Sequence, residues 1–147
     1  VDIAPVTYPQ RFESIFVALR GIDIANLKSR GQADQLLASA IGEPGLRQFL
    51  LQNLERGGDA WRWRSNLSVL NRELRTLAGF PDASDYTIYP GPVLFIWGGA
   101  SDYLKPEFQP RIRTLFPYAR FRVISGAGHW VYAEQPDAFY TALNGFL

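Results

Sequence analysis

The sequence FRVISGAGHW, residues 121–130, decides the fold of this chain, and EQPD follows it at residues 134–137. Its first residues are typical of a strand, and the small residues after them are typical of a loop. The loop carries His129, the only histidine of the chain, and Pro136 then begins a predicted helix. Imidazole is the one side chain whose unperturbed pKa lies near neutrality, so a histidine in this setting is placed for proton transfer. The alternative is a histidine with an ordinary structural hydrogen bond.

The composition limits the class of protein. The chain has 147 residues, of which 47% are hydrophobic and 20% charged, as in a globular domain with its own core. Its net charge of +1 gives no electrostatic basis for binding nucleic acid or an acidic membrane, so we expect neither partner. With no cysteine and one histidine, a disulfide, a thiolate nucleophile and an ordinary zinc site are excluded, and we expect no cofactor.

The chain contains no methionine, and its first residues, VDIAP at positions 1–5, are typical of the end of a strand. We therefore expect it to be the later part of a longer protein, or one product of a cleavage. No apolar run approaches the roughly 20 residues that span a bilayer. We expect a cytoplasmic location, or the mitochondrial matrix if the source is a eukaryote.

The first half of the chain predicts helices. Apolar residues recur at helical spacing in three stretches, 12–19, 33–40 and 46–54, each followed by glycine, and no strand is predicted among them. The strict alternation of WRWR at residues 61–64 predicts an extended segment with both indoles on one face. The indoles either pack the helices onto the rest of the protein or line an apolar pocket. A fourth helix is predicted to begin at residues 66–68 and to end before Gly79.

The second half predicts two parallel α/β units. The apolar run VLFIW, residues 93–97, predicts a strand that is buried on both faces, and a second strand is predicted at residues 120–124. Helices are predicted from about Pro110 and at residues 136–147. Ligands bind such sheets at the carboxyl ends of the strands. The chain therefore brings four polar residues to one edge of the sheet: Asp2, Ser101, Asp102 and His129.

These motifs resemble a known family. GGAS at residues 98–101, GAGHW at 126–130 and EQP at 134–136 resemble the last two β/α units of an α/β-hydrolase. A narrower resemblance, to the small bacterial esterases of the YbfF type and their mitochondrial relatives, rests on the following residues: Val1 to Pro5, Ser29-Arg30, Ala33-Asp34, Phe49-Leu50 and Asn53-Leu54.

The resemblance implies an α/β fold, the C-terminal part of an α/β-hydrolase in which helices flank a parallel sheet and a helical cap is inserted. Residues 1–5 and 80–147 would form the hydrolase core, and residues 6–79 the cap or lid. The implied activity is hydrolysis of a small acyl ester or thioester by a Ser-His-Asp triad.

The resemblance also implies roles for individual residues. His129 matches the catalytic histidine. In the general pattern the acid is the fourth residue counted from the strand-end glycine, and from Gly98 that place holds Ser101, one position before Asp102. In the narrower group the acid comes from the Asp-Ile-Ala-Pro segment, so Asp2 inherits the role. Asp102 is the alternative acid. Ser101 is expected to support the triad acid by hydrogen bonding.

The nucleophile is missing. This fold carries it in a Gly-x-Ser-x-Gly turn, and no such pattern occurs in the chain. The resemblance places it in the N-terminal half of the same protein, which we expect as a partner of this chain. Four aromatic residues are candidates to bound the acyl pocket, and the alternative for each is to pack within the protein: Phe49, Trp61, Trp63 and Trp130.

Two alternative functions keep the same fold. Epoxide hydrolases, haloalkane dehalogenases and C–C hydrolases use this histidine and acid with other nucleophiles or substrates. A non-catalytic module on the hydrolase scaffold would bind a small ester without turning it over. A hydrolase assay separates these functions.

Overall fold

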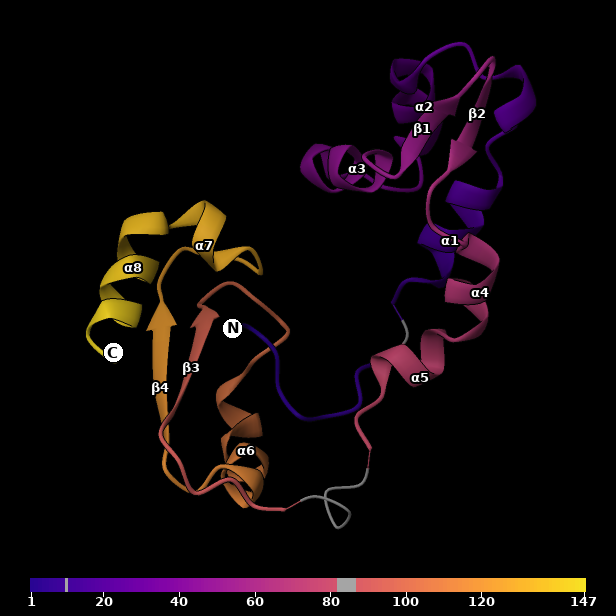
Figure 1. The fold of residues 1–147 in the computed structure, drawn as a ribbon. Coiled ribbons are helices and arrows are strands. Elements are labelled where there is room, and N and C mark those ends of the chain that lie inside the picture. The colour runs from indigo at the N-terminus through magenta and orange to yellow at the C-terminus, as the bar shows by residue number, and fades with distance from the viewer. Residues whose placement is uncertain (10, 82–86) are drawn as a thin grey trace. The chain divides into compact units, whose positions relative to one another are not determined.

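The computed structural model describes residues 1–9, 11–81 and 87–147. These residues form two compact units, each with its own hydrophobic core (Figure 1). The sheet unit comprises Val1–Thr7 and Phe80–Leu147, and the helical unit comprises Tyr8–Gly79. Among the described residues, no helix has the length and the apolar character that crossing a membrane requires.

Two parallel strands form the centre of the sheet unit. β3 (Val93–Gly98) pairs along its whole length with β4 (Ala119–Ile124), so that the last residues of both strands lie side by side (Figure 1). Between them the chain forms a short 3-10 helix, Pro106–Phe108, and α6 (Gln109–Leu115). Both strands and the helix between them agree with the sequence prediction. A parallel pair requires such a crossover, because the chain must return to the starting edge of the sheet.

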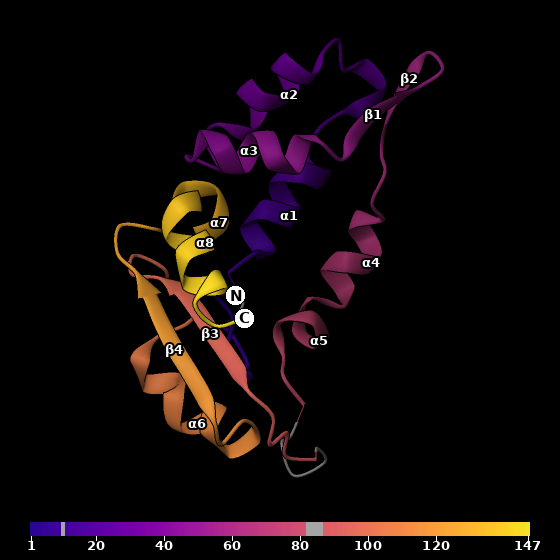
Figure 2. The ribbon, with the colours of Figure 1, turned by 60° about the vertical axis from the view of Figure 1, so that its left-hand side comes forward.

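Helices cover both faces of this sheet (Figure 2). Trp97 packs on one face with Ile112 of α6, while its neighbour Ile96 packs on the other face with residues of α7 (Val131–Glu134) and α8 (Pro136–Asn144). Ile96 and Trp97 are only 2% and 9% exposed. Successive side chains of a strand point to opposite faces, so burial of both residues agrees with the predicted strand covered on both faces.

The described residues of the helical unit form a 3-10 helix, Ile24–Asn26, and the short α-helices α1 (Glu13–Arg20), α2 (Arg30–Leu37), α3 (Pro44–Leu51), α4 (Leu67–Arg72) and α5 (Leu74–Ala78). Ser29 caps α2, because its side chain accepts a hydrogen bond from the Gln32 N–H at 3.1 Å. Pro44 occupies the first turn of α3, where its missing N–H costs nothing. The core of this unit is formed by apolar residues from these helices and their connections: Leu19, Ile22, Leu27, Ala33, Leu37, Ile41, Leu51 and Leu54.

The prediction of a helix through Leu54, with no strand among the first three helical stretches, is wrong. α3 ends at Leu51, and β1 (Leu54–Gly57) pairs antiparallel with β2 (Ala60–Trp63). Gly58 adopts a φ of 69°, a left-handed conformation that suits a hairpin turn. The cross-strand ion pair between Glu55 and Arg62, at 2.8 Å, stabilises the same pairing. The extended conformation predicted for the WRWR segment is confirmed by β2.

Other helix boundaries also differ from those predicted from the sequence. The fourth predicted helix is two helices, α4 and α5, with Glu73 between them. The last helix ends at Asn144 rather than Leu147, and the separate short helix α7 precedes it. Leu143 is 37% exposed, and Phe146 lies beyond the helix. The core contacts of α8 come from Phe139 and Ala142 instead.

Candidate active site

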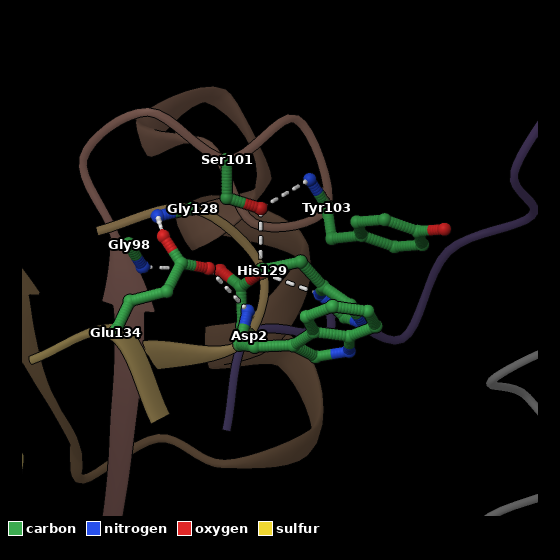
Figure 3. Close-up of polar contacts among 8 residues, drawn as sticks. Asp2, Gly98, Ser101, Tyr103, Gly128, His129 and Glu134 are labelled. Carbon is green, nitrogen blue, oxygen red and sulfur yellow. Dashed lines mark hydrogen bonds and ion pairs between the residues drawn. The ribbon is translucent and has the colours of Figure 1, made fainter. Parts of the chain in front are cut away.

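Asp2 and His129 lie 127 positions apart in the chain and meet at the carboxyl end of β3. Nδ1 of His129 is 2.7 Å from Oδ2 of Asp2 (Figure 3). The Asp2 side chain is 1% exposed, whereas the His129 side chain is 44% exposed. A buried acid therefore holds one side of an imidazole whose other side remains accessible in this chain.

The buried carboxylate of Asp2 has further hydrogen-bond donors. Oδ1 accepts from the backbone N–H of Gly98 at 3.2 Å, and Oδ2 accepts from the hydroxyl of Ser101 at 2.5 Å. A buried charge is costly unless it is paired and hydrogen-bonded. Gly98, Ser101 and His129 together satisfy this requirement, since they supply a backbone N–H, a hydroxyl and a ring nitrogen.

The backbone of Asp2 is not extended, so the prediction of a strand at residues 1–3 is wrong. Its φ is 47°, in the left-handed region that few non-glycine residues adopt and that Asp tolerates better than most. The one strand-like feature that remains is the hydrogen bond from the Asp2 N–H to the carbonyl of Ile96, at 2.7 Å. A backbone in this sparsely populated conformation is found more often at functional sites than elsewhere.

The contact with Asp2 decides which nitrogen of His129 carries the proton. A carboxylate can only accept hydrogen bonds, so Nδ1 donates to Asp2. In the neutral ring the other nitrogen, Nε2, then holds a lone pair. Nε2 can therefore take a proton from a nucleophile, while Asp2 stabilises the positive charge that the ring acquires.

Ser101 is brought to the site with Asp2 and His129, and Tyr103 joins them. The backbone N–H of Tyr103 donates to Oγ of Ser101 at 3.1 Å. The ring of Tyr103 stacks on the imidazole of His129, with ring centroids 4.0 Å apart and planes inclined by 26° (Figure 3). Tyr103 was not predicted from the sequence. Its only sequence signal is its place in the loop after β3, two residues after Ser101.

Asp102, the alternative acid, points elsewhere. Its carboxylate forms an ion pair with Nζ of Lys105 at 2.8 Å, and its side chain is 62% exposed. The hydrogen bond to His129 is made by Asp2. The position after Ser101 thus carries a surface acid, which is a common use of aspartate in a loop of this kind.

The four aromatic candidates lie in different surroundings. Trp61 and Trp63 pack against the core of the helical unit, and their ring nitrogens are buried. Phe49, on α3, is 51% exposed. Trp130 follows His129 directly, and its backbone N–H is bonded to Glu134. A role for these residues in an acyl pocket stays a prediction.

No group of three or more histidine, cysteine, aspartate or glutamate side chains is placed to hold a metal ion within residues 1–9, 11–81 and 87–147. The polar groups at the end of β3 are instead paired with one another, which suits proton transfer between side chains.

The sequence and the fold match known proteins. The model of a family described as "Alpha/beta hydrolase family" matches residues 3–142. The chain is 39% identical over 153 aligned residues to the sn-1-specific diacylglycerol lipase ABHD11 of Xenopus laevis, covering all of the chain and 48% of that protein. It is 36% identical to esterase YbfF of Escherichia coli strain K12, covering all of the chain and 56% of that protein.

A solved structure described as a marine microorganism esterase superposes with a TM-score of 0.90 at 33% identity, covering 99% of this chain and 58% of that one. The chain thus spans about half the length of the curated relatives it matches. The resemblance to the α/β-hydrolases and to their YbfF-type esterases is confirmed, and so is the predicted fold class. The chain belongs to the alpha/beta hydrolase family.

Proposed function

We propose that this chain supplies the base and the orienting acid of a Ser-His-Asp hydrolase that cleaves carboxylic esters or thioesters. The observation that carries the proposal is the 2.7 Å contact between Asp2 Oδ2 and His129 Nδ1. The names of the relatives support the substrate class, because they include an esterase and a diacylglycerol lipase.

In the proposed mechanism, the serine belongs to the N-terminal half of the same protein. Nε2 of His129 removes the proton of the serine hydroxyl as its oxygen attacks the carbonyl carbon of the ester. The imidazolium then protonates the departing alcohol or thiol, which leaves an acyl-enzyme. Water, deprotonated by the same nitrogen, releases the acid and restores the serine. Asp2 holds the ring in the required tautomer throughout.

The two units have different roles in this proposal. In this proposal the sheet unit, Val1–Thr7 and Phe80–Leu147, is part of the catalytic core, and the helical unit, Tyr8–Gly79, is the cap of the hydrolase. Aromatic residues would bound the acyl pocket: Phe49, Trp61, Trp63 and Trp130. We place the protein in the cytoplasm or, in a eukaryote, in the mitochondrial matrix. The absence of cysteine is compatible with either of these reducing compartments.

The test uses the longer protein that joins this chain to the N-terminal half. Its turnover of p-nitrophenyl acetate, p-nitrophenyl butyrate and an acyl thioester is compared with that of the His129→Ala variant. We expect ester turnover in the wild type and nearly complete loss in the variant, with the folded state retained. Full turnover by the variant would contradict the proposal.

A fluorophosphonate probe, which modifies an activated serine covalently, separates the alternatives. We expect the wild-type protein to be labelled on one serine and the His129→Ala variant to be labelled far more slowly. Turnover of an epoxide or a haloalkane without serine labelling would favour one of the other hydrolase chemistries. Ester binding without turnover or labelling would favour a non-catalytic module.

A further inference from the structure

The loop that carries His129 must be held in place for the histidine to work. The contact with Asp2 fixes the imidazole at Nδ1. The position of the ring also depends on the backbone of residues 125–130, the loop between β4 and α7. A displacement of about 1 Å at a reacting group costs up to about 100-fold in rate. The groups that hold this backbone therefore bear directly on catalysis.

One carboxylate holds the backbone on both sides of the histidine. Oε2 of Glu134 accepts from the N–H of Gly128 at 2.7 Å, and Oε1 accepts from the N–H of Trp130 at 3.1 Å (Figure 3). These are the N–H groups of the residues immediately before and after His129. Hydrogen bonds to a charged acceptor are about twice as strong as those between neutral groups.

We propose that Glu134 is a positioning residue that presents His129 to the reacting serine. This inference rests on the proposed function, and it adds a residue that the proposed mechanism does not use. The bonds of Glu134 described above go to the backbone and not to the imidazole. Glu134 therefore acts through the path of the loop and takes no part in the proton transfer.

The other side of the loop lies against the end of β3. A Cβ atom placed on Gly98 would lie 2.0 Å from the carbonyl oxygen of Gly128 and 2.4 Å from that of Ala127. The N–H of Ala100 also donates to the Ala127 carbonyl at 2.9 Å. The carbonyls of Ala127 and Gly128 thus lie against the end of β3, while the N–H groups of Gly128 and Trp130 are bonded to Glu134. The loop is held from both sides.

We call the two hydrogen bonds from the N–H groups of Gly128 and Trp130 to Glu134 the clamp, and the surroundings of Gly128 agree with it. A Cβ atom on Gly128 would lie 3.1 Å and 3.2 Å from the two carboxylate oxygens of Glu134. The carboxylate therefore lies in close contact with the place that a side chain at position 128 would take. A larger residue there would require the carboxylate to shift by a few tenths of an ångström.

The position of Glu134 in the chain makes the clamp short and local. Glu134 is the last residue of the single-turn helix α7, and its own N–H donates to the carbonyl of Trp130 at 2.9 Å. The carboxylate therefore folds back over one helical turn to reach the start of that turn. Shortening the side chain by one methylene would remove this reach.

The test uses the longer protein that joins this chain to the N-terminal half, with Glu134→Ala, Glu134→Gln and the control Asp137→Asn. Asp137 is an exposed acid in the first turn of α8, so its variant removes one nearby negative charge without changing the clamp. For Glu134→Ala we expect kcat to fall about 10- to 100-fold, with KM within about twofold. Glu134→Gln should lie in between, because an amide offers only one acceptor oxygen. The control should keep wild-type kcat.

Counting active sites distinguishes a positioning role of Glu134 from a role in stability alone. Fluorophosphonate labelling at completion gives the number of competent serines, and kcat is then expressed per labelled site. Loss of stability alone would lower the number of sites and leave kcat per site unchanged, which would overturn the inference. We expect the opposite result, an unchanged number of sites with a lower kcat and a slower labelling rate at each site.

Two further measurements keep the inference testable. If Glu134→Ala does not fold, Glu134→Gln carries the test, because it keeps the length of the side chain: its kcat per labelled site should fall, and wild-type kcat in that variant would overturn the inference. If the wild-type protein turns over no ester, the proposed function fails. Amide hydrogen exchange at Gly128 and Trp130 then tests the clamp itself. Faster exchange in Glu134→Gln supports the clamp, and unchanged exchange contradicts it.

Discussion

The hydroxyl of Ser101 donates to Oδ2 of Asp2 at 2.5 Å, although the two residues are 99 positions apart. The same oxygen is 2.7 Å from Nδ1 of His129. Ser101 therefore stands close to the place that a carboxylate must occupy to bond with the imidazole. It is also the position at which the general pattern of the family carries its acid. For these two reasons we expect that a substitution can move the triad acid from Asp2 to position 101, in the loop after β3.

We predict that Ser101→Asp restores part of the activity that Asp2→Asn removes. In the double variant a carboxylate at position 101 can reach Nδ1 of His129, because Oγ of Ser101 already bonds the oxygen that contacts this nitrogen. The measurement is kcat for p-nitrophenyl butyrate in the single and double variants. We expect at least a tenfold gain of the double variant over Asp2→Asn.

The control is Ser101→Asp alone, which should lower activity because two carboxylates would then compete for the same donors. A double variant no more active than Asp2→Asn would contradict the prediction. It would indicate that the loop after β3 cannot deliver an acid to His129.

The ring of Tyr103 should support His129 through stacking and not through its hydroxyl. The two rings lie 4.0 Å apart between centroids, and such a pair contributes about 0.5–1.5 kcal/mol. We predict that Tyr103→Phe keeps wild-type kcat, while Tyr103→Ala lowers it by up to about tenfold. Steady-state kinetics on one ester checks both variants. A large loss in Tyr103→Phe would show that the hydroxyl, and not the ring face, is the functional group.

Gly98 should tolerate no side chain. The Cβ atom of an alanine would overlap the carbonyls of Gly128 and Ala127, and backbone atoms cannot move aside as a flexible side chain can. We expect Gly98→Ala to lower the free energy of unfolding by about 1–3 kcal/mol or more, and to lower kcat as well. Gly42→Ala is the matched control, since a Cβ there meets nothing within 4 Å. Its unfolding free energy should change by no more than about 0.5 kcal/mol. Equal denaturation midpoints for the two variants would contradict this account.

The sheet could be predicted from sequence because its signals are local. β3 is an apolar run bounded by proline and glycine, β4 is a short segment that ends in apolar residues before a loop of small residues, and both lengths suit strands rather than helices. The β1–β2 hairpin was missed because Leu54 continues the apolar spacing of α3, so the pattern favoured a longer helix. The left-handed φ of Gly58 and the pairing of Glu55 with Arg62 decide the hairpin, and neither can be read from a helical pattern.

The site was predictable only in part. A lone histidine on a small-residue loop indicates a base, but no spacing links it to Asp2, 127 positions away. That link came from the resemblance to a family. Tyr103 and Glu134 were not predicted at all. The contact of Tyr103 with His129 depends on how two loops lie against each other at the end of β3. The contacts of Glu134 are local, but a glutamate that binds backbone N–H groups has no sequence pattern of its own.

The central claim is that Asp2, and not Asp102, orients the base. The measurement that tests it most directly is kcat for a p-nitrophenyl ester in Asp2→Asn and Asp102→Asn variants of the longer protein, each checked for folding by thermal unfolding. Loss of the orienting acid of a triad costs on the order of 10⁴ in kcat, and we expect a loss of this size in Asp2→Asn. Asp102 is ion-paired with Lys105 at the surface, so its variant should stay within about threefold of wild type. Wild-type turnover in Asp2→Asn, or a greater loss in Asp102→Asn, would contradict the account.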